Sequence, residues 1–164
     1  MIRMLKELLD LLEKNARYTT TDLAALLDAD EDDIARTISK AERENIIAGY
    51  HTVINWNKAD SEIVKAVIAV NCMPERDAGY DRVANIIAKY PEVDSLYLMS
   101  GKAEFLLRVS ARTMREVSNF VAHKLAPIEG VNGTETMFIL KEYKTSGVLL
   151  SDDSEDGERL LVTP

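Results

Sequence analysis

Four polar side chains in residues 36–43 have the chemistry and the spacing to bind nucleic acid. At about 100° per residue, one face of a helix over this segment carries Arg36, Ser39, Lys40 and Arg43. The opposite face carries Ile34, Ile38 and Ala41. Long cations and hydroxyls contact phosphates and base edges, while an apolar back anchors a helix in its domain. The pattern predicts a DNA-recognition helix in which Arg36 contacts guanine and Lys40 and Arg43 contact the backbone.

Acidic residues oppose this interpretation. Residues 30–33 are all carboxylates, and although acids suit the first turn of a helix, Asp32 falls on the basic side and would approach phosphate. Arg36 could also simply pair with Asp32 at the i, i+4 spacing. The net charge of −8 works against DNA binding, because affinity depends on Lys and Arg displacing counterions. A sensing or assembly module with weak or lost DNA binding is therefore an alternative.

Three predicted helices in the first 45 residues would position this face. The first carries a leucine stripe at i, i+3, i+4 and i+7, formed by Leu5, Leu8, Leu9 and Leu12. The second begins at Thr20 or Thr21, both good N-cap residues. Its buried side would be Leu23, Leu26 and Leu27. The third begins at the cap Asp30 and ends near Asn45. Two helices joined by a tight turn and braced by a third form a helix-turn-helix. Its predicted DNA-binding residues are Thr21, Arg36, Thr37, Ser39, Lys40 and Arg43.

The chain after residue 62 alternates between strand and helix patterns. The predicted strands are 63–70, 93–99, 105–109 and 134–140, and the predicted helices are 79–90 and 113–125. A hairpin turn at 100–103 joins the two middle strands. The order β-α-β-β-α-β is the ferredoxin-like arrangement. The predicted fold class is α+β, with an N-terminal helix-turn-helix (winged-helix-like) domain followed by a ferredoxin-like dimerisation and effector domain.

These patterns divide the chain into four segments. We assign 1–47 to the helix-turn-helix, 48–61 to a linker strand that includes Tyr50 to Ile54, 62–145 to the ferredoxin-like domain, and 146–164 to an acidic tail. Both helices of the second domain must cover one face of the sheet, yet the strands carry apolar residues on both faces. A second copy is the simplest cover for the other face, which predicts a homodimer. The alternative is that the linker strand or the tail folds over it.

Composition limits the other function classes. One cysteine, Cys72, allows no internal disulfide, and with only two histidines, His51 and His123, a dedicated zinc site is improbable. We expect no cofactor. No apolar run is long enough for a signal peptide or a spanning helix. The expected location is the cytoplasm, with no membrane partner.

Fragments spread along the chain resemble the Lrp/AsnC (feast/famine) regulators up to about Lys144. In the first part these are residues 8–17 (LLDLLEKNAR), 22–24 (DLA), 34–38 (IARTI) and 46–50 (IIAGY). In the second part they are residues 90–93 (YPEV), 100–104 (SGKAE) and 130–136 (GVNGTET). Each fragment is weak alone, but their order and spacing together are specific.

The resemblance implies a regulator that binds double-stranded DNA as a dimer or a larger assembly, often an octameric ring of four dimers. It also implies an amino-acid effector held near the hairpin turn. The implied effector residues are Ser100, Gly101, Lys102, Ala103, Glu104, Thr134, Glu135 and Thr136. The turn could present backbone N–H groups to a carboxylate, and Glu104 could hold an ammonium, although a tight hairpin favours glycine at position 101 in any case.

The sequence departs from the family in two places. The family usually has Asp at the position of Glu104 and an aromatic residue at that of Ala103, which leaves the effector open. Its recognition helix is usually more basic at the positions of Asp33, Thr37 and Ser39. An enzyme related to haem-pathway decarboxylases is a further alternative, since those enzymes are similar in both domains. The two histidines lack the neighbours that such catalysis requires, so the prediction is a regulator rather than an enzyme.

Overall fold

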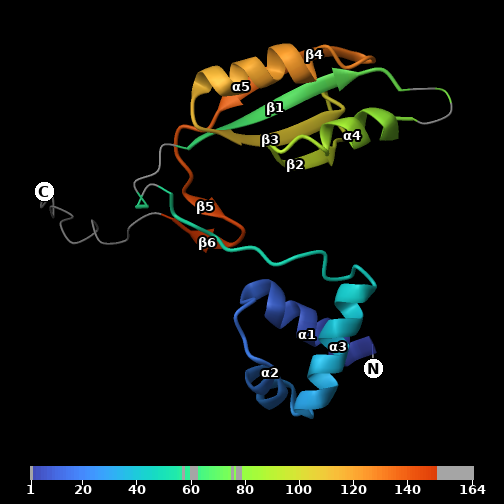
Figure 1. Ribbon diagram of the computed structural model, residues 1–164, viewed down its shortest axis with the longest axis vertical. Coiled ribbons are helices and arrows are strands. Elements are labelled where there is room, and N and C mark those ends of the chain that lie inside the picture. The colour runs from blue at the N-terminus through green and yellow to red at the C-terminus, as the bar shows by residue number, and fades with distance from the viewer. Residues whose placement is uncertain (1, 57, 60–62, 75, 77–78, 151–164) are drawn as a thin grey trace, which may run out of the picture. The chain divides into compact units, whose positions relative to one another are not determined.

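The computed structural model describes residues 2–56, 58–59, 63–74, 76 and 79–150 (Figure 1). The chain divides into two compact units, Met1–Val53 and Ile54–Pro164. Within the described residues, no helix combines the length and the apolar character needed to span a bilayer.

The first unit consists of the helices α1 (Ile2–Lys14), α2 (Thr20–Leu27) and α3 (Glu31–Arg43). Asp30 caps α3 as predicted, because its side chain accepts a hydrogen bond from the N–H of Asp32. The cap of α2 is Thr19, not Thr20 or Thr21. Thr19 is extended and forms a reciprocal capping box with Asp22, which satisfies two backbone donors at once.

A small apolar core joins the three helices. Its buried side chains are Leu8, Leu12, Leu23 and Ile34, and Ile47 packs against them from beyond α3. The prediction that Leu26 is buried is wrong, because its side chain is 57% exposed. The helices α1 and α3 cover only a narrow stripe of α2, and Leu26 lies about 60° from Leu23 around the helix axis.

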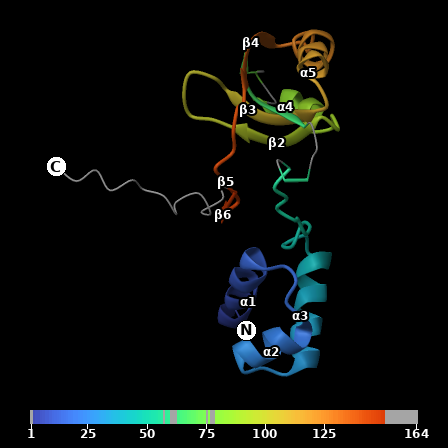
Figure 2. The same cartoon turned by 90° about the vertical axis from the view of Figure 1, so that its left-hand side faces the viewer.

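The second unit contains a four-stranded antiparallel sheet. The strands are β1 (Val64–Cys72), β2 (Val93–Leu98), β3 (Phe105–Ala111) and β4 (Val131–Phe138). Their spatial order is β2-β3-β1-β4, which confirms the ferredoxin-like prediction. The helices are α4 (Asp81–Ile87) and α5 (Met114–Phe120), and α5 continues into the π-helical turn η1 (Val121–Leu125). Figure 2 shows these elements from a second direction.

Both helices pack against the same side of the sheet. Alternate residues of β1, including Ile68 and Val70, share one core with Val83 and Ile87 of α4 and Val117 of α5. Two further core residues of α5–η1 are Phe120 and Leu125. The helix predicted over 79–90 is shorter, beginning only after Gly79, whose φ is +57°.

The other face of the sheet is mixed rather than uniformly apolar. Arg108 of β3 pairs in register with Val67 of β1, which pairs with Met137 of β4. Met137 is 46% exposed, and Tyr97 on β2 is 56% exposed. The Arg108 Nε atom is buried without a hydrogen-bond partner in the part of the chain that the structure describes.

A short hairpin, β5 (Lys144–Thr145) with β6 (Val148–Leu149), follows the sheet. It turns through Ser146 and Gly147, which have φ values of +45° and +80°. The hairpin crosses the predicted boundary at residue 145, so the described start of the segment 146–164 is folded. The acidic run after residue 150 lies outside the described residues.

The segment before β1 is anchored near this hairpin. The Asn55 Nδ2 atom donates to the carbonyl of Leu150 at 2.9 Å, and Lys65 forms a largely buried ion pair with Glu142. The strand predicted at Tyr50 to Ile54 is wrong, since these residues belong to no strand. A strand requires a neighbouring backbone to complete its hydrogen bonds, and no described segment pairs with this one.

Candidate nucleic-acid interface and effector loop

The polar face of α3 is open to solvent, as predicted. Ile34 and Ala41 are buried behind it. In front, four exposed side chains follow one another along the helix, namely Arg36, Ser39, Lys40 and Arg43. Thr21, the second residue of α2, is also exposed, and Thr37 is half-buried. The helix thus has the anchored back and polar front that a recognition helix requires.

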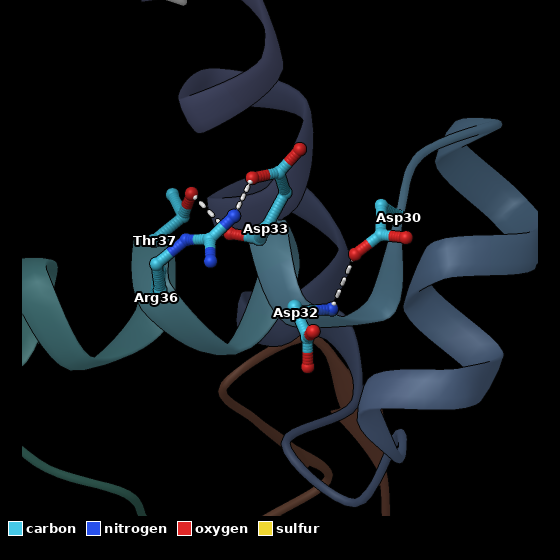
Figure 3. A network of polar contacts seen from close by, with 5 residues as sticks. All are labelled: Asp30, Asp32, Asp33, Arg36 and Thr37. Atoms are coloured by element: carbon cyan, nitrogen blue, oxygen red, sulfur yellow. Dashed lines mark hydrogen bonds and ion pairs between the residues drawn. The ribbon is translucent and has the colours of Figure 1, made fainter.

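Arg36 is paired within its own helix. Its guanidinium donates to the carboxylate of Asp33 (Figure 3), and this contact raises the pKa of Arg36 above its usual value. The partner is therefore Asp33 at i, i+3, whereas the sequence pointed to Asp32. Figure 3 shows the carboxylate of Asp32 directed away from Arg36. The Asp32 backbone N–H donates to the carboxylate of Asp30 at 2.9 Å.

The remaining polar side chains of this face differ in whether they already have a partner within the protein. The Thr37 hydroxyl donates to the carbonyl of Asp33 at 2.7 Å, and its oxygen can still accept a hydrogen bond. Lys40 Nζ lies 3.8 Å from a carboxylate oxygen of Glu44. Within the described chain, Ser39 and Arg43 have no side-chain partner. Arg43 is thus the cation most ready to meet a phosphate, and Arg36 must leave Asp33 to reach a base.

The charge around this face is negative. Residues 30–44 hold three cations and six carboxylates, and residues 1–53 as a whole hold seven cations and eleven carboxylates. Any DNA contact must therefore form locally, through a few cations, against a repulsive background.

The second candidate site is the loop 99–104 between β2 and β3. The Met99 N–H donates to the Glu104 carbonyl at 2.8 Å and closes the hairpin, which confirms the predicted turn. Gly101 does not have a positive φ, and a Cβ at this position would meet nothing within 4 Å. Turn geometry therefore does not require glycine at position 101, contrary to the expectation from the sequence.

Glu104 is tied to the sheet. Its carboxylate accepts a hydrogen bond from the backbone N–H of Cys72 at the end of β1, at 3.0 Å. Burial, with a smaller contribution from the Glu104 charge, raises the pKa of the Cys72 thiol, so this cysteine is an unreactive packing residue. This contact was not predictable, since 32 residues separate the two partners.

The other predicted effector residues lie on β4 and are split by strand alternation. Thr134 and Thr136 pair with Val70 and Ile68, on the helix-covered side of the sheet. Glu135 pairs with Ala69 on the opposite side and is exposed. Val70 also pairs with Phe105, immediately after the loop. Thr134 thus lies at the end of the sheet that adjoins the loop 99–104. The three β4 residues cannot all face one ligand, because they point to opposite sides of the sheet.

Among the described residues, neither histidine belongs to a group of side chains that could bind a metal. His51 and His123 are both exposed. Among the residues that the structure describes, no group of three His, Cys, Asp or Glu side chains could hold a metal ion.

Comparison with known proteins gives consistent matches. Residues 65–149 match the Lrp/AsnC ligand binding domain. A relative in Bacillus subtilis, the HTH-type transcriptional regulator YugG, is 35% identical over 159 residues, covering 96% of this chain and 95% of its own. The leucine-responsive regulatory protein of Rhizobium meliloti is 27% identical over 143 residues, covering 87% of this chain and 88% of its own.

Solved structures match over a similar length. A Neisseria meningitidis transcriptional regulator in complex with L-Met superposes with a TM-score of 0.68 at 26% identity, covering 90% of this chain and 95% of its own. AsnC of Escherichia coli has a TM-score of 0.64 at 19% identity, covering 87% and 94%.

Proposed function

Since this chain belongs to the Lrp/AsnC family, we propose that it is a helix-turn-helix transcription regulator that reads DNA with α3 and responds to a small molecule through its C-terminal unit. The observation that carries the proposal is the exposed polar face of α3, set on a buried apolar back. Relatives over nearly the full chain are transcription regulators, which favours regulation over catalysis. The place of action is the cytoplasm, where DNA is accessible.

Specific DNA contact is assigned to Arg36, Thr37, Ser39, Lys40 and Arg43, with Thr21 of α2 on the phosphate backbone. A gel-shift titration on the DNA upstream of the protein's own gene, at low and moderate salt, tests the proposal. We expect a specific complex whose affinity falls as salt rises. No complex at any salt, with the oligomer intact, would instead favour the assembly module, which the acidic surroundings of α3 support.

Replacing Asp33 with asparagine is expected to strengthen DNA binding by up to about fivefold, because an exposed ion pair that restrains Arg36 is lost together with one repulsive charge. Fluorescence anisotropy with a labelled operator fragment measures the change. Asp28→Asn is the matched control, since Asp28 is an exposed carboxylate of the same unit that does not contact Arg36. Equal gains in DNA affinity in the two variants would mean that the effect comes from net charge alone. The Asp33–Arg36 pair would then have no role in limiting DNA binding.

The assembly proposed is a homodimer formed through the mixed face of the sheet. Exposed Tyr97 and Met137 would be covered, and the orphaned Arg108 Nε would find an acceptor on the second copy. Larger rings of dimers, up to an octamer, are part of the same proposal. Arg108→Met removes this hydrogen bond and should therefore shift the equilibrium towards the monomer, as measured by sedimentation velocity. An unchanged dimer would place the interface elsewhere.

An amino acid is the proposed effector, at the loop 99–104. Two variants separate a ligand contact from a structural role of Glu104. Glu104→Gln keeps an acceptor for the Cys72 N–H but loses the charge, and Glu104→Ala loses both. If Glu104 holds the effector's ammonium, both variants should lose about tenfold or more in effector affinity by calorimetry. Recovery of wild-type affinity in Glu104→Gln would show that the residue only ties the loop to β1.

A further inference from the structure

A groove at the opposite end of the sheet has no role in the function proposed above. Its volume is about 1070 Å³. It lies where β1 begins and β3 ends, since Val64 pairs with Ala111 there, whereas the loop 99–104 adjoins the far end of β1. Six of its lining residues matter here, namely Trp56, Ile63, Glu92, Arg112, Phe120 and His123.

Specific local structure builds the two walls of this groove. On one side, a turn closed by the Ala59 N–H on the carbonyls of Asn55 and Trp56 positions the indole, and Asn55 is itself held by Leu150. On the other side, α5 widens into η1, where the Ala126 N–H donates to the Val121 carbonyl at 2.8 Å. Such π turns inside helices recur at functional sites. Here the π turn carries His123 and Lys124 to the groove.

Glu92 contributes an acceptor that the protein leaves unused. One carboxylate oxygen is paired with Lys124, and this contact lowers the pKa of Glu92, so the group is charged at neutral pH. The other oxygen, Oε2, is buried, and no other described residue donates a hydrogen bond to it, although the backbone N–H of Glu92 itself also helps to lower the pKa of the carboxyl. Buried acceptors in native proteins are nearly always satisfied. An orphan at the wall of a groove therefore indicates that a ligand supplies the donor.

Arg112 contributes a cation that is equally unused. Its guanidinium has no partner among the residues that the structure describes. The nearest carboxylate in sequence, Glu116, instead accepts the Arg112 backbone N–H at 2.9 Å. The groove thus presents an unpaired cation and an unpaired carboxylate oxygen beside two aromatic side chains, Trp56 and Phe120.

We propose that this groove binds a small zwitterion with an apolar body, independently of the loop 99–104 and of DNA. The ligand's anionic group would pair with Arg112, its N–H donor would satisfy Glu92 Oε2, and its apolar part would pack on Trp56 and Phe120. Apolar walls with a few convergent polar groups are typical of small-molecule sites.

The only tryptophan of the chain lies in the groove, so its fluorescence reports occupancy directly. The probes are L-phenylalanine and two analogues that each lack one charge, 3-phenylpropionate and 2-phenylethylamine. We expect L-phenylalanine to change the Trp56 emission saturably, with an affinity about tenfold or more above that of either analogue. No saturable change with L-phenylalanine or with L-leucine, in fluorescence and calorimetry alike, would overturn the proposal.

Three variants assign the contacts. Arg112→Ala should lower the affinity for L-phenylalanine and for 3-phenylpropionate about tenfold and leave the affinity for 2-phenylethylamine unchanged. Glu92→Gln should abolish the preference for L-phenylalanine over 3-phenylpropionate. Arg115→Ala, an exposed arginine of α5 outside the groove, is the matched control and should bind as wild type. Losses no greater than those of Arg115→Ala would overturn the proposal. Loss of the Trp56 signal in Glu104→Ala would overturn it too, by moving the ligand to the loop. All measurements are made without DNA, so they stand whether or not α3 binds it.

Discussion

Arg36→Ala is expected to weaken binding to the specific DNA site by roughly five- to 150-fold, the range for losing one bidentate contact with guanine. Arg36 lies in the first half of α3, the part of a recognition helix that enters the major groove, and its side chain is exposed. The measurement is fluorescence anisotropy with the upstream fragment and with a scrambled fragment of the same composition. Weakening should be much larger for the specific fragment than for the scrambled one.

Arg3→Ala is the matched control for this prediction. Arg3 is also an exposed arginine of the first unit that is paired within its own helix, in this case with Glu7. The two variants therefore remove the same charge and the same type of ion pair. If both variants weaken binding to the specific and to the scrambled fragment by the same factor, Arg36 contributes only a nonspecific positive charge. The assignment of α3 as the helix that reads the DNA sequence is then wrong.

Leu8→Ala is expected to destabilise the first unit by about 2–5 kcal/mol, because it removes a fully buried side chain. Among the described residues, the centre of that core is formed by four large buried side chains, so a loss of this size is a large fraction of a small domain's stability. DNA binding should then fall with rising temperature well before the second unit unfolds. Circular dichroism melting and anisotropy at matched temperatures measure the two effects.

Leu26→Ala is the control for the core prediction. It makes the same change of side chain in the neighbouring helix, but Leu26 is 57% exposed. We expect a stability change within about 0.5 kcal/mol. Equal destabilisation by the two variants would mean that Leu8 does not lie at the centre of the core described above.

The periodic features of both units were predictable from the sequence because they depend on near neighbours. The leucine spacing of α1 and the Asp30 cap of α3 follow from contacts within a few residues. The order of strands and helices along the chain restricts the sheet to few topologies, and the observed spatial order β2-β3-β1-β4 fits the predicted ferredoxin-like arrangement. The exposed polar front of α3 was likewise visible in the sequence.

The features that were missed depend on geometry or on distant partners. Arg36 had carboxylates at both i−3 and i−4, and only side-chain geometry selects Asp33. Glu104 is held by a backbone group 32 residues away. The groove near Trp56 combines segments more than fifty residues apart, and its π turn interrupts a stretch that reads as continuous helix. No local pattern encodes such pairings.

The hydrogen bond from Asn55 to Leu150 has a consequence for how tightly a dimer could hold DNA. Ile47 packs on the first unit, and the Tyr50 hydroxyl donates to Glu42 of α3. Because Asn55 is fastened to the second unit, the connection between Tyr50 and Asn55 can extend at most about 18 Å. In the proposed dimer, two such connections and the paired second units would join the two DNA-binding units. Once one unit had bound its half-site, they would set the effective concentration of the other unit, which for short connections is in the millimolar range. Operator occupancy would therefore depend on the length of this connecting segment as much as on any single contact with a base.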